Sequence, residues 1–242
     1  MRLGLAMLAL QASIGALNDL RDAPADAIGK PSKPIPAGLV RPGTAQALGV
    51  AALILGLLLT WPSGPAAIAI AVLGVGSGYV YDLWLKPTPL SWLPLAVALP
   101  LLPAFAWVGA GAGLPPAYAL LVPLAIAAGA GLALANALAD VERDRSAGLV
   151  NIVVRLGPSL AWRVHAGLHL VVIAVAFGLL GLVGGRGPGV ALAVVGAGLL
   201  GGGALLGQGG GALRRERAWE LEAIGVAVLG IGWLAATAGL GA

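Results

Sequence analysis

Eight apolar segments follow one another along the chain, each close to the length of a bilayer-spanning helix. A transmembrane helix needs about 20 predominantly apolar residues. Only 10% of the 242 residues are charged and 59% are hydrophobic, whereas a soluble domain carries about 25% charged residues. We therefore predict an all-α polytopic membrane helical bundle that forms one domain over residues 1–242. Its expected spans are residues 1–18, 43–61, 64–82, 90–110, 117–140, 159–184, 188–207 and 219–240.

The connections between these segments alternate in character. Residues 19–42, 82–89, 140–163 and 208–222 hold every Asp and Glu, and every Lys and Arg except Arg2 and Arg186. Because basic loops stay in the cytoplasm, we predict a multi-pass protein of the cell inner (cytoplasmic) membrane whose charged side faces the cytoplasm. Eight alternating spans would then put Met1 outside the cell. One further helix before residue 1 would return the start to the cytoplasm, and we expect such a helix.

Composition also excludes several classes of site. The chain has no cysteine, which rules out disulfides, thiolate metal sites and cysteine nucleophiles. Its net charge is +4, but nucleic-acid binding needs a basic patch with stacking aromatic residues. Here the basic residues lie in short connections beside apolar segments. We therefore expect the chain to contact membrane lipids and not to bind nucleic acid.

The first polar connection contains a regularly spaced set of oxygen-bearing side chains. Asn18, Asp22 and Asp26 are four residues apart, with Asp19 beside the first of them. On a continuous helix this spacing puts them on one face. Pro24 leaves open whether the helix continues or breaks before Asp26.

The same spacing occurs a second time, after the fifth apolar segment. Asn136, Asp140 and Asp144 repeat the pattern in a chain that has only six Asp residues. Carboxylates at a membrane boundary are costly unless positive charge lies between them. Oxygen ligands of this kind suit Mg²⁺, which binds one or two carboxylates together with substrate phosphate oxygens. Two such clusters are a candidate site for a diphosphate held through Mg²⁺, with the apolar bundle receiving a hydrocarbon tail.

At these residues the sequence resembles the UbiA superfamily of intramembrane prenyltransferases. The first family motif, N-D-x-x-D-x-x-x-D, is matched by residues 18–26, and the following run Lys33-Pro-Ile-Pro-Ala-Gly38 is similar to the branch near chlorophyll synthase and digeranylgeranylglyceryl phosphate synthase. The second motif, D-x-x-x-D-x-x-x-G, is matched by Asp140, Asp144 and Gly148. The family commonly has Lys and Thr just after that glycine, where this chain has Leu149 and Asn151. Residues 79–86 resemble the family's Tyr/Lys loop.

The resemblance implies Mg²⁺-dependent transfer of a polyprenyl group from an isoprenoid diphosphate to a lipophilic acceptor. The family usually has nine spans, whereas eight are predicted here. The resemblance therefore implies that the first family helix is the one without a counterpart. The implied catalytic residues are Asp22, Asp26, Asp140 and Asp144. The implied metal ligands are Asn18, Asp19, Asp22, Asp26, Asn136, Asp140 and Asp144. Diphosphate would be bound by Lys30, Lys33, Lys86, Arg143 and Arg145, and the substrate pocket would include Tyr81 and Trp107.

Two other functions remain open. A membrane terpene cyclase would use the same Asp motifs without an acceptor. A transporter would carry charges near the middle of its spans, whereas the charges here gather at one side. His165 and His169, four residues apart, have no carboxylate nearby in sequence, so packing is favoured over metal ligation. Arg214, Arg215 and Arg217 are expected to anchor the chain near anionic lipid.

Overall fold

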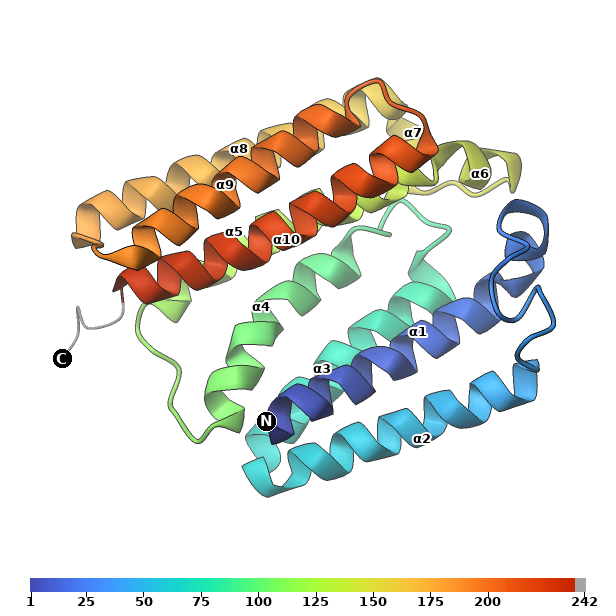
Figure 1. Cartoon of the computed structure of the whole chain (residues 1–242), viewed down its shortest axis with the longest axis horizontal. Helices are drawn as coiled ribbons and strands as arrows, with labels where there is room; N and C mark the ends of the chain where they lie inside the picture. The colour runs from blue at the N-terminus through green and yellow to red at the C-terminus, as the bar shows by residue number, and fades with distance from the viewer. Residues whose placement is uncertain (238–242) are drawn as a thin grey trace. The chain divides into compact units, whose positions relative to one another are not determined.

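The computed structural model describes residues 1–237, and these form helices without any strand. Seven of the helices are long and apolar enough to cross a membrane, and α4 is a shorter apolar helix of 17 residues. The prediction of an all-α bundle with about eight apolar helices is confirmed. The chain divides into two compact units, Met1–Ala119 and Leu120–Ala242, and Figure 1 shows the helices of each.

The first unit holds four apolar helices and two short helical turns. In chain order these are α1 (Arg2–Gly29), α2 (Pro42–Thr60), η1 (Trp61–Ser63), α3 (Pro65–Val80), η2 (Tyr81–Leu85) and α4 (Leu93–Gly109). Helix α1 packs along α2 and also contacts α3, and α3 packs against α4 (Figure 1). The core between them contains the buried side chains of Ala6, Leu10, Ala71, Val75 and Phe105.

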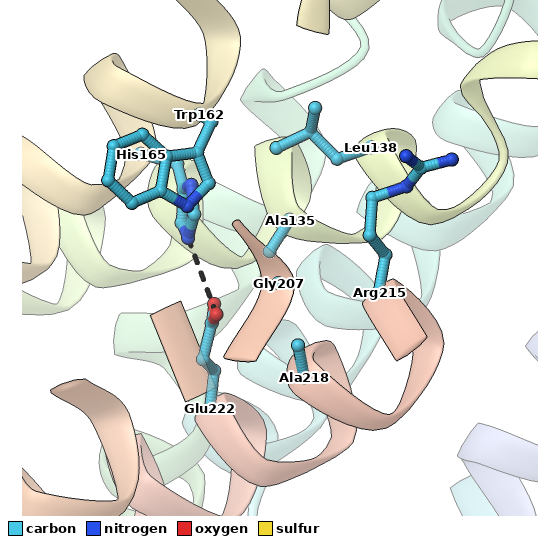
Figure 2. A pocket seen from close by; sticks show the side chains of 8 residues that line it. All are labelled: Ala135, Leu138, Trp162, His165, Gly207, Arg215, Ala218 and Glu222. Atoms are coloured by element: carbon cyan, nitrogen blue, oxygen red, sulfur yellow. Dashed lines mark hydrogen bonds and ion pairs between the residues drawn. The ribbon is translucent and has the colours of Figure 1, made fainter. Parts of the chain in front are cut away.

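The second unit holds four long helices and two short ones. They are α5 (Tyr118–Ala139), α6 (Val141–Ser146), α7 (Ile152–Leu156), α8 (Pro158–Val183), α9 (Pro188–Gly207) and α10 (Ala212–Thr237). Helices α9 and α10 run side by side (Figure 1). Between α8 and α10, His165 contacts Glu222 in the interior (Figure 2).

Glycine followed by proline starts three of the apolar helices. Gly64, Gly157 and Gly187 adopt positive φ angles directly before Pro65, Pro158 and Pro188. Glycine adopts positive φ without strain, and proline is favoured in the first turn because it needs no N–H donor there. These pairs explain how the chain turns sharply at the start of α3, α8 and α9.

Two helices extend further into the polar connections than the sequence indicates. Helix α1 continues through Pro24 to Gly29, although we expected the span to end at residue 18. Proline lacks one backbone donor, and the loss of one helical hydrogen bond does not end this helix. Helix α10 begins at Ala212 rather than near residue 219, so Glu222 lies ten residues inside it.

The packing of α9 on α10 depends on small residues. A methyl group at Gly196 would overlap the backbone of Leu229, whereas a methyl group at Gly198 would meet nothing within 4 Å. Without water as the surrounding solvent, helix association relies on such close backbone contact.

We expect Gly196→Ala to lower the free energy of unfolding by about 1–3 kcal/mol, the usual cost of overpacking. Thermal unfolding of the purified protein in detergent measures this change. Gly198→Ala, in the same helix, is the control and should leave the melting temperature nearly unchanged. Equal melting temperatures for the two variants would contradict the close α9–α10 contact.

Candidate functional site

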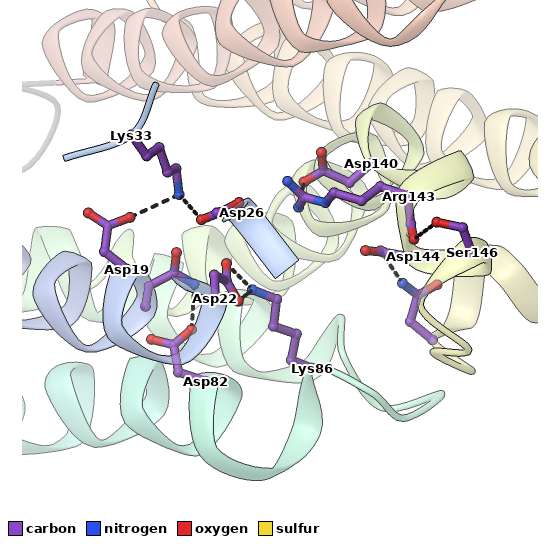
Figure 3. Close-up of polar contacts among 12 residues, drawn as sticks. Asp19, Asp22, Asp26, Lys33, Asp82, Lys86, Asp140, Arg143, Asp144 and Ser146 are labelled. Atoms are coloured by element: carbon purple, nitrogen blue, oxygen red, sulfur yellow. Dashed lines mark hydrogen bonds and ion pairs between the residues drawn. The ribbon is translucent and has the colours of Figure 1, made fainter. Parts of the chain in front are cut away.

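The first acidic cluster consists of Asn18, Asp19, Asp22, Asp26, Lys33, Asp82 and Lys86. Its members come from the last three turns of α1, the connection 30–41, and the segment around η2 (Figure 3). Because α1 stays helical through Pro24, Asn18, Asp22 and Asp26 recur at intervals of about one turn. The sequence left this point open, and the structure decides for a continuous helix.

Two lysines pair with three carboxylates in this cluster. Lys86 Nζ lies 2.5 Å and 2.6 Å from the two carboxylate oxygens of Asp22. Lys33 Nζ lies 2.9 Å from Asp19 Oδ1 and 2.8 Å from Asp26 Oδ2. Asp26 is buried, with 1% of its side chain exposed, while Asp19 is 44% exposed. Lys33 thus attaches the connection 30–41 to α1, and Lys86 attaches the end of η2 to α1.

The Lys33 ammonium is held in its charged form. Partial burial lowers the pKa of Lys33, but hydrogen bonds to Asp26 and Asp19 and the negative charge of both raise it by more. The pKa therefore lies above its ordinary value, and the two ion pairs persist through neutral pH. The contribution of the Lys33 charge to stability is lost as the pH rises through this raised pKa.

Asp82 is a member of the cluster that the sequence analysis did not select. Its side chain is 5% exposed, and its Oδ1 accepts a hydrogen bond of 2.8 Å from Asn18 Nδ2. With Asp82, the cluster contains four carboxylates and two lysine ammonium groups. The available signal was an acidic residue at the end of an apolar segment, four positions before Lys86.

The second acidic cluster consists of Asp140, Arg143, Asp144 and Asn151. Helix α5 ends at Ala139, and Asp140 lies between it and α6, so this motif spans a helix break rather than one continuous helix. Arg143 Nη2 donates a hydrogen bond of 2.7 Å to Asp140 Oδ2. Asp144 is buried and accepts a hydrogen bond of 2.7 Å from Asn151 Nδ2 (Figure 3).

Asn151 has a structural explanation where the resembled family commonly has threonine. Its Oδ1 accepts from the backbone N–H groups of Val153 and Val154 and so caps α7. Its amide group meanwhile donates to Asp144. Gly148, the motif glycine, has a φ of 72°, which permits the turn between Asp144 and Asn151. One side chain thus fixes both the start of α7 and the orientation of Asp144.

The comparisons with known proteins identify the family of this chain. The model of the UbiA prenyltransferase family matches residues 2–214. The chain belongs to the UbiA family. With its long apolar helices, it is therefore a multi-pass membrane protein.

Relatives and solved structures extend the likeness. The digeranylgeranylglyceryl phosphate synthase of Methanopyrus kandleri is 32% identical over 149 residues, which are 62% of this chain and 55% of that protein. The synthase of the same name from Ignicoccus hospitalis is 41% identical over 31% of this chain and 25% of that protein. The chain thus spans about half or less of these two relatives.

Two solved structures have the same fold. The UbiA homologue from Aeropyrum pernix K1 has a TM-score of 0.71 and 22% identity, over 96% of this chain and 86% of that one. The homologue from Archaeoglobus fulgidus bound to GPP and Mg²⁺ has a TM-score of 0.65 and 21% identity, over 95% of this chain and 88% of that one.

The remaining predicted residues lie near the clusters to different degrees. Lys86 also lies 5.9 Å from the centre of the Tyr81 ring. Lys30 follows directly after α1, Arg145 is exposed on α6, and Asn136 is partly buried on α5. Trp107 of α4 packs edge-on against Tyr118 at the start of α5, with ring centres 5.7 Å apart. The structure does not bring Trp107 into the polar contacts of the first acidic cluster.

Arg215 differs from the expected lipid anchor. It lies on α10 with 12% of its side chain exposed, donates to the Gly210 carbonyl at 2.6 Å, and forms an ion pair with Glu142 of α6. Arg217 pairs with Glu220 on the surface of α10. Arg215 therefore contributes to the fold of the second unit.

The double contact of Asn151 generates a test. Asn151→Ala removes the cap of α7 and the donor to Asp144, and we expect a loss of about 0.5–2 kcal/mol in stability, the usual cost of a lost cap. Asn151→Ser keeps a capping oxygen and should recover most of the loss. Thermal unfolding in detergent compares the three proteins. A melting temperature for Asn151→Ala equal to that of the unaltered protein would contradict the assigned role.

Proposed function

We propose that this chain transfers a polyprenyl group from an allylic isoprenoid diphosphate to a lipophilic acceptor and releases diphosphate. The observation that carries this proposal is the first acidic cluster, four carboxylates and two lysines at the end of apolar membrane helices. Membership of the UbiA prenyltransferase family supports it. A hydrocarbon tail suits the apolar helices, and a charged diphosphate suits the cluster.

Mg²⁺ fits the donor set of this cluster. Carboxylate and amide oxygens are the ligands that this cation prefers, and Asn18, Asp19, Asp22, Asp26 and Asp82 supply them. Lysine ammonium groups already lie against three of the carboxylates, so these oxygens attract cations. The Archaeoglobus fulgidus homologue bound to GPP and Mg²⁺ supports the same cofactor. When bound, Mg²⁺ would neutralise negative charge on the leaving diphosphate.

We propose that the second acidic cluster also takes part in the reaction by binding Mg²⁺ and diphosphate. Asp140 and Asp144 are its carboxylates, and Asn136 is an additional amide ligand from α5. The hydrogen bond from Asn151 to Asp144 and the contact from Arg143 to Asp140 orient both carboxylates before substrate binds. Such preorientation lowers the entropic cost of assembling the site.

Basic residues are proposed to bind the diphosphate oxygens directly. Lys33 and Lys86 are held beside the carboxylates, and their ammonium groups can donate to phosphate oxygens once cations replace them there. Lys30, Arg143 and Arg145 are further candidates. The bond between the allylic carbon and the diphosphate oxygen breaks, and its electron pair leaves with the diphosphate. The allylic carbon then bonds to an electron-rich atom of the acceptor, which loses a proton to solvent.

The named relatives favour one donor and one class of acceptor. The similar proteins from Methanopyrus kandleri and Ignicoccus hospitalis are both named digeranylgeranylglyceryl phosphate synthase. We therefore propose a geranylgeranyl donor and a glyceryl phosphate lipid as acceptor. The new bond would be an ether between the allylic carbon and a glycerol hydroxyl oxygen.

Diphosphate release from geranylgeranyl diphosphate tests the proposed chemistry. The purified protein should release diphosphate with Mg²⁺ and the acceptor, and should stop when EDTA is added. Asp22→Asn and Asp144→Asn should each lower the rate by about a hundredfold or more, because even an indirect metal partner typically contributes about 10–100-fold. Glu216→Gln changes an exposed carboxylate of α10 and is the control that should retain the rate.

Two results would count against this function. Release that is unaffected by EDTA and by both Asp variants would exclude the acidic clusters from the reaction. Release without acceptor, with a cyclic hydrocarbon as product, would instead assign a terpene cyclase.

The proposed site faces the cytoplasm of a cell inner membrane, because the basic connections lie on its side. The chain has no cysteine, so one introduced thiol reports its own location. In right-side-out vesicles, a membrane-impermeant maleimide should label Ala112→Cys, in the short connection before α5, and should leave Ser32→Cys unlabelled until the membrane is opened. The reverse pattern would invert the orientation. Both positions are exposed, so burial does not confuse the comparison.

A further inference from the structure

Two histidines and a glutamate, none of them part of the second acidic cluster, meet in the interior of the second unit. His165 and His169 lie on α8, and Glu222 lies on α10. Each is about 1–2% exposed. His165 Nε2 lies 3.3 Å from Glu222 Oε1, and His169 Nδ1 lies 3.5 Å from Glu222 Oε2 (Figure 2 draws the first of these contacts). From the sequence alone, packing is favoured for the histidines, because no carboxylate lies near them along the chain.

Ionisable groups inside a membrane bundle are costly and usually mark a functional site. Glu222 lies ten residues into α10, which is about 15 Å along the helix at 1.5 Å per residue. His165 Nδ1 and Glu222 Oε2 have no hydrogen-bond partner among the described residues. Both ring nitrogens of His169 also lack a hydrogen bond of normal distance and angle, although the Ala128 backbone interacts weakly with the ring. The ion pair by itself therefore leaves several buried polar atoms unsatisfied.

We infer that His165, His169 and Glu222 form a binding site for a divalent transition metal of the zinc class. Two imidazoles and one carboxylate are a ligand set that zinc uses when it keeps an open fourth position. One ligand atom from each of the three side chains lies within 4.8 Å of the others. Ligands of a tetrahedral zinc ion lie roughly 3.3 Å apart, so small side-chain rotations complete the site. Imidazole nitrogen favours zinc and its neighbours over Mg²⁺.

Neighbouring helices leave room for these side chains. A methyl group at Gly131 of α5 would overlap the His169 ring, and all three of its nearest atoms belong to that ring. A methyl group at Gly203 of α9 would lie 2.5 Å from Glu222 Cγ. A small pocket borders His165 and Glu222 and offers a position for a water ligand; its other lining residues are Ala135, Leu138, Trp162, Gly207, Arg215 and Ala218 (Figure 2).

The charge of the surroundings is compatible with a bound cation. The nearest basic side chain in the pocket is Arg215, and its charge is offset by the ion pair with Glu142. A divalent ion would offset Glu222 and occupy the ring nitrogens that lack partners. It would also connect α8 to α10, so we expect binding to stabilise the second unit.

The composition makes the test specific. The chain has two histidines and no cysteine, so imidazole ligation of zinc can arise only from this cluster. The protein is purified with a histidine-free tag, incubated with zinc, and dialysed. Metal analysis should find zinc bound in stoichiometric amount, and X-ray absorption should show imidazole nitrogen in its coordination shell. Zinc should raise the melting temperature relative to EDTA.

Variants distinguish this site from the acidic clusters. His169→Ala and Glu222→Gln should each weaken zinc binding by more than about tenfold, whereas Asp22→Ala should retain it. Gly131→Ala keeps all three ligands but displaces the His169 ring, and it should weaken binding as well. Gly167→Ala on α8 is its matched control, since a methyl group there meets nothing within 4 Å.

Folded protein that binds no zinc, or zinc with only oxygen ligands, would overturn the inference. So would undiminished binding in folded His169→Ala and Glu222→Gln proteins. If these variants do not fold, X-ray absorption on the unaltered protein still shows whether imidazole nitrogen binds the zinc. None of these measurements depends on prenyl transfer, so the metal site stands or fails separately from the proposed activity.

Discussion

Negative charge at the ends of apolar helices is the constraint on which the rest of this structure depends. A carboxylate near a bilayer is stable only with a positive partner, and the first unit contains four such groups within one cluster. Lys33 and Lys86 reach back to α1 from different parts of the chain and offset part of that charge. These ion pairs set the paths of the connection 30–41 and of η2.

The same requirement links the fold to its proposed chemistry. The first acidic cluster gathers four carboxylates, oxygen ligands that suit a divalent cation bound together with a diphosphate. Its buried members, Asp26 and Asp82, are held by Lys33 and Asn18. The apolar helices beside the cluster suit a hydrocarbon tail. A substrate that joins a diphosphate to a hydrocarbon therefore matches both environments.

Much of this arrangement could be predicted from the sequence. The apolar segments are continuous and close to bilayer length, so hydropathy alone identifies the helices. The two Asp motifs have helical spacing and resemble those of the UbiA family, whose membership the comparison confirms. The continuation of α1 past Pro24 could not be predicted, because proline ends some helices and is tolerated in others.

Long-range contacts were the other part that the sequence concealed. Asp82 is more than sixty residues from Asn18, and Glu222 is more than fifty from His165 and His169. A periodic pattern reports the neighbours within one helix, and it contains no information about which helix packs beside it. The sequence therefore does not reveal Asp82 or Glu222 as partners of these residues, although both side chains are buried. Asn151 was read as a departure from a motif, and its contact with Asp144 gives it a role.

Binding of an unreactive substrate analogue, measured by thermal unfolding, tests the central claim most directly. The claim is that the acidic clusters hold a diphosphate together with Mg²⁺. Geranylgeranyl thiodiphosphate, which resists ionisation, should raise the melting temperature clearly when Mg²⁺ is present and by much less with EDTA. We expect Asp22→Asn to remove this difference, since a ligand stabilises only the state that binds it. An equal shift with and without Mg²⁺, or no shift in a folded protein, would contradict it.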